Sequence, residues 1–583
     1  MGKIGNNTNL IVLKNTNDFN RFISKNNWLD EKDFGDICYR YGFPGNSLTV
    51  VIEKYYIDAV YRDAYYSYWA KTHFNWPRYC YRIFLFLNAH QMKEFLDQEK
   101  NEILNSDFLG TIVVRPPYSS ETDHTFGRTL LNPYKMLTMT EEQGVSNPFK
   151  YLITAKYKFH LFGNIYTTRA FPFMSQDGAV MKCAETAVCE LCDYAAASSE
   201  QYARILPSDI QEKLKERLPE RILPSHGLYC NDISYLLGRF GFSPMIYAET
   251  DTECVEKGFT NEGSLNVRIG AAAINKKTLI EDKEIESTWD KKHVTDFKDW
   301  FHYYVESAIP VLTISSPNQE VHKHATLVIG HGMKRESIEK CKKYRLNDFP
   351  CIDTSKLYEN YIVQDDNQIP YVEEQMDCFT QKKNYKLNAF IVPLDKHVFL
   401  EASAAISIFD SFIEHECELL KRAVDDIVFQ CKQNESAQTE EDIKKQYEYM
   451  VRAFEISSNN PMAIRYYLAN SAKYKSYRIK NGETKEDKLF YADASMPKAV
   501  WVAEISTYKL YEMGYAFAEV VIDATASNRS KINSIILLKV AHLGVFRLPH
   551  ESFAAFMAKL ERPDKHSNLT PMFMMFSNYI NDN

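Results

Sequence analysis

A cysteine at the start of a helical run is the residue of this sequence best placed to do chemistry. Cys183 precedes a stretch rich in helix formers, which runs from Ala184 to Ala197. The N-terminal end of a helix carries a partial positive charge, and that charge favours a thiolate over a thiol. Because the thiolate is the nucleophilic form of cysteine, this position predicts nucleophilic chemistry.

A candidate base and a candidate acid follow in chain order. His324 leads the apolar run Ala-Thr-Leu-Val-Ile-Gly, and Asp365 and Asp366 end the run Tyr-Ile-Val-Gln; both runs are typical of buried strands. A thiol nucleophile needs a base for its proton, and an acid can orient that base. We prefer Asp365 by its place at the strand end. Adjacent strand residues point to opposite faces, so we expect only one carboxylate to reach the imidazole Nδ1–H.

Two other histidines lie close to His324 in the sequence. His322 and His331 are competitors for the role of base. We prefer His324 because it alone precedes the apolar run that would be buried behind it, and we expect His331 in a turn or behind the site.

The same residues resemble a known enzyme family. With Gln176 upstream of the cysteine, they are similar to the papain-like cysteine peptidases of the bacteriocin-leader-processing type and their bacterial relatives, over roughly residues 166 to 375. The resemblance implies Cys183 as nucleophile, His324 as base, Asp365 as the acid that orients it, and Gln176 as a donor to the oxyanion hole.

Three positions depart from the pattern of that family. Gln176 lies seven positions before Cys183, which is one more than in the better-known members. Ala184 stands in place of the usual glycine after the cysteine, and Asp366 stands where proline commonly follows the acid. These departures bear on the oxyanion hole and the substrate class more than on the fold.

Length and composition predict several folded domains. The 583 residues exceed what one hydrophobic core normally supports, and 45% hydrophobic with 25% charged residues is ordinary for a globular protein. We expect an α+β fold throughout, with a papain-like domain over residues 166–385 between α+β domains at residues 1–165 and 386–583.

Charge and hydropathy argue against several classes of partner. With 69 basic and 77 acidic residues the formal charge is −8, and no long basic block occurs, so an extensive nucleic-acid surface is not expected. We find no apolar run long enough to cross a membrane and no apolar leader at the N-terminus. We therefore expect a cytoplasmic protein whose twelve cysteines stay reduced.

Other motifs give weaker signals. Cys189 and Cys192 form half of a zinc motif, but they fall within the expected helix and no second pair accompanies them, so we expect no metal and no cofactor. Arg115 and Arg128 can form a ligand site at strand ends, although a structural role as hydrogen-bond donors is the preferred interpretation.

The sequence thus predicts a cytosolic, bacterial, multidomain cysteine peptidase that cleaves a peptide or isopeptide bond in a protein substrate. The flanking domains are expected to select that substrate or to gate the cleft. Two alternatives stay open: an acyltransferase or deamidase that uses the same three residues, and an inactive peptidase-like binding module.

Overall fold

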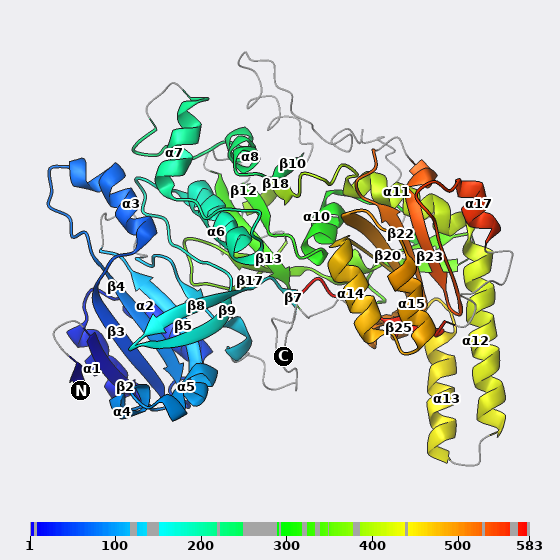
Figure 1. The fold of residues 1–583 in the computed structure, drawn as a ribbon, viewed down its shortest axis with the longest axis horizontal. Helices are drawn as coiled ribbons and strands as arrows, with labels where there is room; N and C mark the ends of the chain where they lie inside the picture. Colours follow the sequence, from blue (N-terminus) through cyan, green and yellow to red (C-terminus); the bar gives the residue numbers. More distant parts are fainter. Residues whose placement is uncertain are drawn as a thin grey trace.

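The protein is an α+β protein with three main sheets, as its computed structural model shows (Figure 1). About 39% of the structure is helix and 30% is strand, which confirms the expected α+β fold class. The structure describes residues 2–4, 8–116, 125–136, 151–218, 222–248, 289–290, 293–317, 323–332, 338–347, 349–376, 385–437, 441–527, 531–559 and 569–579.

The N-terminal sheet is antiparallel, and its six strands follow chain order. These strands are β1 (Gly2–Ile4), β2 (Thr8–Leu13), β3 (Leu48–Tyr56), β4 (Cys80–Leu87), β5 (Phe108–Val114) and β6 (Leu130–Leu131). Both faces of this sheet are covered, and most buried positions of β3 and β4 are apolar; Val50 faces one core and Val51 the other.

Helices and a hairpin cover the two faces of this sheet. Helices α1 (Thr16–Lys25), α2 (Glu31–Arg40) and α3 (Ala59–Ser67) share one core with it. On the other face lie α4 (Met92–Phe95), α5 (Asn101–Asp107) and the hairpin of β8 (Ala155–Leu161) and β9 (Asn164–Ala170). The hairpin alternates buried and exposed residues along β8, as expected for a ribbon with one face in water.

The central sheet carries the residues that the sequence singles out. Its strand order is β10-β18-β12-β13-β16-β17, all pairs are antiparallel, and the short strand β7 (Tyr151–Leu152) also pairs with β13. The strands are β10 (Ser243–Ala248), β12 (Val311–Pro317), β13 (His324–His331), β16 (Asn360–Gln364), β17 (Val372–Gln375) and β18 (Tyr385–Leu394).

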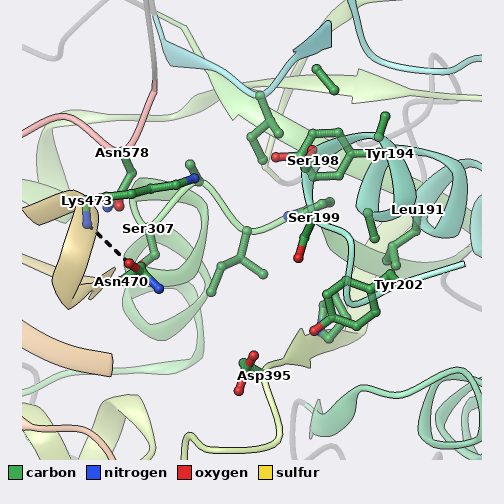
Figure 2. Close-up of a pocket in the computed structure, with 18 of the residues that line it drawn as sticks. Leu191, Tyr194, Ser198, Ser199, Tyr202, Ser307, Asp395, Asn470, Lys473 and Asn578 are labelled. Atoms are coloured by element: carbon green, nitrogen blue, oxygen red, sulfur yellow. Dashed lines mark hydrogen bonds between the residues drawn. The ribbon is translucent and has the colours of Figure 1, made fainter. Parts of the chain in front are cut away.

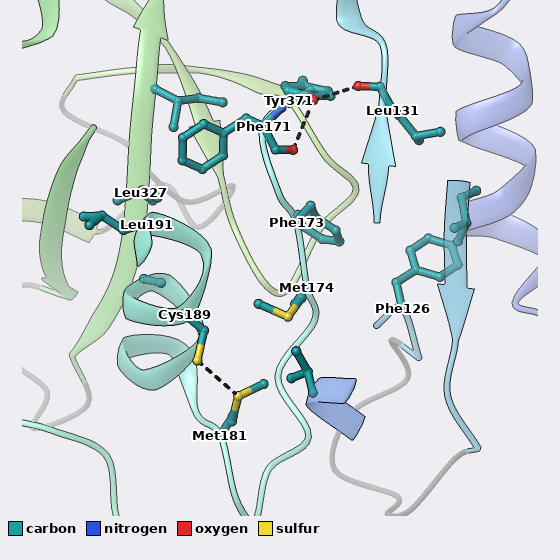
Figure 3. Packing of buried hydrophobic residues seen from close by; sticks show 14 of the residues in the cluster. Phe126, Leu131, Phe171, Phe173, Met174, Met181, Cys189, Leu191, Leu327 and Tyr371 are labelled. Atoms are coloured by element: carbon teal, nitrogen blue, oxygen red, sulfur yellow. Dashed lines mark hydrogen bonds between the residues drawn. The ribbon is translucent and has the colours of Figure 1, made fainter. Parts of the chain in front are cut away.

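Within the described residues, four helices belong to the region of the central sheet. They are α6 (Cys183–Ser198), α7 (Pro207–Lys215), α8 (Cys230–Arg239) and α10 (Phe297–Glu306). Helix α6 packs against β13 in a core that continues to the N-terminal sheet (Figure 3). Phe171, Phe173 and Met174 fill the space between α6 and that sheet. This shared core fixes the helix that begins at Cys183 relative to the strand that begins at His324.

The C-terminal sheet has the strand order β11-β14-β15-β19-β20-β22-β23-β24. Its strands are β11 (Trp289–Asp290), β14 (Lys343–Leu346), β15 (Phe349–Asp353), β19 (Met462–Asn470), β20 (Ala499–Thr507), β22 (Ala518–Asp523), β23 (Ile535–Val540) and β24 (Leu543–Phe546). A two-stranded pair of β21 (Tyr515–Ala516) and β25 (Phe573–Met574) lies apart from it.

Helices flank this sheet, and two of them project from the molecule. Helices α12 and α13 contact each other and extend away from the sheet as a long hairpin (Figure 1). The helices of this region are α11 (Ala402–His415), α12 (Cys417–Ala437), α13 (Glu441–Phe454), α14 (Ser471–Asn481), α15 (Lys485–Asp493), α16 (Tyr508–Glu512) and α17 (Phe553–Ala558).

One face of the C-terminal sheet buries a row of four charged side chains, with two glutamates between an arginine and a lysine. Arg465, Glu504, Glu519 and Lys539 are successive cross-strand partners from β19 to β23. Arg478 of α14 closes the row, with its Nη2 2.6 Å from Glu504 Oε1 and 2.5 Å from Glu519 Oε2. Buried charges are tolerated only when they are paired, so this row depends on every member being present.

The same row joins the C-terminal sheet to the central sheet. Arg465 Nε donates to Glu306 Oε1 of α10 at 2.6 Å, and Glu306 Oε2 lies 2.8 Å from Nε2 of His331. His331 is the last residue of β13 and is fully buried. It therefore belongs to a strand and to this ionic contact, and not to a turn.

The expected domain boundaries do not coincide with the edges of the sheets. The boundary at 165/166 falls inside β9, and the one at 385/386 falls at the start of β18, which is an interior strand of the central sheet. Strands β11, β14 and β15, which precede residue 386, belong to the C-terminal sheet. In the part of the chain described, no helix has the length and apolar character needed to cross a membrane.

Candidate active site

The segment before Cys183 is held by one buried carboxylate. Asp177 Oδ1 accepts hydrogen bonds from the backbone N–H groups of Ala179, Val180 and Met181 at 2.9, 2.7 and 3.0 Å. Gly178 has a φ of +74°, a conformation that glycine adopts without strain. The loop is thereby fixed close to the start of α6.

Cys183 is the first residue of α6, as the sequence predicts. Glu185 Oε2 accepts from the backbone N–H of Lys182 at 3.2 Å, which caps the helix, and its Oε1 accepts from the Ser225 hydroxyl. Burial raises the pKa of Glu185, and the hydrogen bonds from Ser225 and Lys182 oppose that change. Cys183 itself is half-buried, so its sulfur stands at the positive end of the helix with partial access to solvent.

Pairing of β13 with β16 brings the histidine to the acid. Leu327 pairs with Gln364, the last residue of β16, so that His324 lies beside the turn that follows β16. His324 Nε2 is 2.8 Å from Asp365 Oδ1, and the two side chains are 13% and 4% exposed. Asp365 also accepts from Asn367 N at 3.1 Å and from Gln368 Nε2 at 2.9 Å.

The imidazole of His324 also contacts the thiol of Cys183. Burial acts to lower the pKa of His324, but hydrogen bonds to Asp365 and to Cys183 outweigh burial and raise that pKa well above its usual range. The pKa of Asp365 is lowered. Burial acts to raise it, but the hydrogen bond and the charge of His324 outweigh burial. His324 therefore interacts with both Cys183 and Asp365, and these two neighbours favour a protonated imidazole beside an ionised carboxylate.

The orientation of the ring corrects one expectation. Asp365 meets Nε2 of His324, and not Nδ1. Since Nε2 bonds to Asp365, we infer that Nδ1 is the ring nitrogen that serves the thiol.

A second correction concerns Asp366. Its Oδ1 lies 3.7 Å from His324 Nε2, so both carboxylates are near the ring. Strand β16 ends at Gln364, and the backbone N–H of Gln368 bonds to the carbonyl of Asp365 in a turn. The alternation of strand side chains no longer applies in that turn, which explains why the expectation of a single facing carboxylate was wrong.

Gln176 lies in the same site, but its amide already has a partner. Its Nε2 donates to Asn367 Oδ1 at 2.7 Å, and Asn367 Nδ2 lies 3.4 Å from His324 Nε2. Asn367 therefore lies between Gln176 and the histidine, a position that we did not expect. The only signal in the sequence is its place two residues after Asp365.

The structural role expected for Arg115, as a hydrogen-bond donor, is confirmed. Its Nη2 donates to the backbone carbonyls of Ser175 and Gln176 at 2.8 and 3.2 Å, so this buried arginine supports the loop that carries Gln176. Arg128 forms an ion pair with Asp193 of α6, with Nε and Oδ2 2.5 Å apart. Both arginines hold structure together.

Three further candidates remain, of which two cysteines are buried and one histidine lies outside the described residues. Cys189 and Cys192 are within α6, and burial raises the pKa of both thiols. Cys189 Sγ packs 3.9 Å from Met181 Sδ (Figure 3). His322 lies outside the described residues.

One grouping in the described chain has the spacing of metal ligands. His324, Asp365 and Asp366 offer ligand atoms within 4.8 Å of one another. An ion there would need the Nε2 that now bonds to Asp365. The mutual pairing of these residues accounts for their closeness, and we assign them no metal.

A cavity of about 610 Å³, which neither Cys183 nor His324 lines, lies between the second half of α6 and the start of α14 (Figure 2). Tyr194, Ser199, Asn470 and Lys473 are among its lining residues. Neither a cysteine nor a histidine is among the described residues that line it, so it offers no thiol chemistry.

Comparison with known proteins adds no name to this site. No protein-family model matches the chain, and a search of curated proteins finds no match. The functional argument therefore rests on the geometry of Cys183, His324, Asp365 and Gln176.

Proposed function

We propose that this protein is a cysteine peptidase that cleaves a peptide or isopeptide bond in a protein substrate. The observation that carries the proposal is the meeting of three groups: His324 bonds to Asp365 at 2.8 Å and interacts with the thiol of Cys183 at the start of α6. A nucleophile, a base and an orienting acid in mutual contact are the parts that acyl transfer from a peptide requires.

Each proposed step uses a group of the site. The Cys183 thiolate attacks the substrate carbonyl, and the imidazolium of His324 gives its proton to the leaving amine. Water then hydrolyses the thioester, with His324 accepting the proton of that water. Asp365 keeps the ring in place throughout.

The oxyanion needs two donors, and the site offers both. The backbone N–H of Cys183 lies at the start of α6, where backbone donors have no partner within the helix. The Gln176 amide has two N–H hydrogens, and only one of them is used by Asn367. The contact with Asn367 therefore orients Gln176 and leaves one hydrogen for the oxyanion.

The setting of the proposed reaction follows from the cysteines and from the charge. No disulfide joins the cysteines that the structure describes, which supports a reducing compartment such as the cytoplasm. The papain-like arrangement and the bacterial origin belong to the same proposal. A protein or peptide is the partner that the site supports, and the net charge of −8 gives no support for nucleic acid.

Product analysis tests the proposal. We expect the purified full-length chain to produce new termini in a mixture of unfolded polypeptides, as detected by mass spectrometry. Cys183→Ala should remove this activity, whereas Cys230→Ala should not, although Cys230 is also half-buried and also begins a helix.

Other products would replace the proposal by one of its alternatives. An intact polypeptide with a mass shift at glutamine or asparagine would indicate deamidation. A new bond between two peptides would indicate acyl transfer. Binding with no chemical change would indicate a peptidase-like binding module.

A further inference from the structure

Asp366 places a second buried carboxylate beside His324. Its side chain is 4% exposed, and its Oδ1 is 3.7 Å from Nε2 of the imidazole. Its two oxygens have no donor in hydrogen-bond geometry among the described residues, and the neighbouring carboxyl of Asp365 opposes the ionisation of Asp366. A buried carboxylate without hydrogen bonds is costly, and such a group in a native structure calls for an explanation.

The groups that face Asp366 come from three elements. His324 approaches from β13, Asp365 precedes it in the same turn, and Glu190 approaches from α6. Burial raises the pKa of Glu190 well above its usual range, and the charges of Asp366 and Asp365 add to that effect, although the backbone N–H of Met174 donates to it. Burial therefore favours the neutral form of Glu190, and His324 is the basic neighbour of Asp366.

We propose that Asp366 is a positioning residue whose carboxylate stabilises the protonated imidazole of His324 from beside Nε2. This inference rests on the proposed function, because the protonated imidazole is the partner of the Cys183 thiolate. Asp365 fixes the ring through its hydrogen bond. Asp366 acts through charge alone, since it lies beyond hydrogen-bond distance.

The charge of Asp366 changes in the neutral range. Burial raises the pKa of Asp366 to about 7; the charge of His324 opposes this change and that of Asp365 adds to it. Below pH 7 the carboxyl is neutral and gives His324 no support. Above pH 7 it is ionised and holds the proton on the imidazole to higher pH, so its effect belongs to the basic limb of the pH profile.

The test compares pH profiles of kcat/KM for the full-length wild type, Asp366→Asn and Glu374→Gln. Asparagine keeps the shape of Asp366 and removes its charge. Glu374 is the matched control, since it is a half-buried acid that contacts Gln368 at the edge of the same site. We expect the basic limb of Asp366→Asn to move down by about one pH unit, with the acid limb unchanged, and Glu374→Gln to match the wild type.

A titration of the His324 ring by NMR provides a second measurement that needs no turnover. In the wild type the ring signals should show two inflections, one near pH 7 from Asp366 and a higher one from the imidazole itself. In Asp366→Asn the first should disappear and the second should move down. The wild-type curve alone decides the matter if the variant does not fold.

The outcomes separate this inference from the proposed function. Turnover with an unchanged basic limb, or a single inflection for wild-type His324, would overturn the role of Asp366 and leave the peptidase proposal intact. No turnover by the wild type on any polypeptide would overturn the proposed function and the inference together. A uniform loss of activity at every pH would mean that Asp366 is structural only.

Discussion

Replacing His324 by glutamine is expected to lower kcat/KM at neutral pH by about 10³-fold or more. Glutamine keeps a side-chain N–H that can donate to Asp365, so the buried carboxylate retains a partner. It cannot carry the proton from the thiol to the leaving amine. Kinetics on a peptide that the wild type cleaves, together with thermal midpoints, measure both effects.

The matched control for this variant is His160→Gln. His160 is an exposed residue of β8, a strand that carries none of the candidate site residues, and its substitution should leave kcat/KM unchanged. Activity of His324→Gln within threefold of the wild type, in a folded protein, would remove His324 from the mechanism.

Asp365→Asn is expected to lower kcat/KM by a factor on the order of 10 to 10³. The asparagine can present its N–H to Nε2, which favours a ring orientation or tautomer unsuited to the thiol. The loss should stay below that of His324→Gln because Asp366 still faces the ring at 3.7 Å. Asp365 also accepts hydrogen bonds from Asn367 and Gln368, so we expect a thermal midpoint lower by a few degrees.

The double variant Asp365→Asn/Asp366→Asn separates the two acids. If both support the imidazolium, the double variant should lose more activity than Asp365→Asn alone, and the two effects should not be additive because the residues share one partner. Equal activity of Asp365→Asn and the wild type would mean that another group orients His324.

The sequence predicts the three groups of the proposed site because each lies at the start or end of a strongly patterned element. Cys183 begins a run of helix formers, and His324 begins an apolar strand. The turn after β16 has no such periodicity, so the side-chain directions of Asp365 and Asp366 were not predictable. The role of Asn367 depends on its contact with Gln176, which is 191 residues away along the chain.

The expected domain boundaries do not coincide with the edges of the sheets for a related reason. Strand pairing over long sequence distances leaves no local signal: β15 pairs with β19, and β7 pairs with β13. Patterns of β-branched residues located several of these strands, but they do not say which sheet a strand joins. The ion pair of Glu306 and Arg465, which joins two sheets, could not be predicted from the sequence either, because its partners are 159 residues apart.

The central claim is that His324 makes Cys183 a nucleophile toward peptide carbonyls, and a peptide-based electrophile tests it most directly. The probe is incubated with the reduced full-length protein, and mass spectrometry then maps the adduct and its rate. Cys230 is the internal reference because it shares with Cys183 the start of a helix and partial burial. The account predicts that Cys183 is the main site of the adduct and reacts at least about tenfold faster than Cys230. In His324→Gln, the rate at Cys183 should fall to the rate at Cys230. Equal rates at the two cysteines, or a Cys183 rate that His324→Gln leaves unchanged, would contradict it.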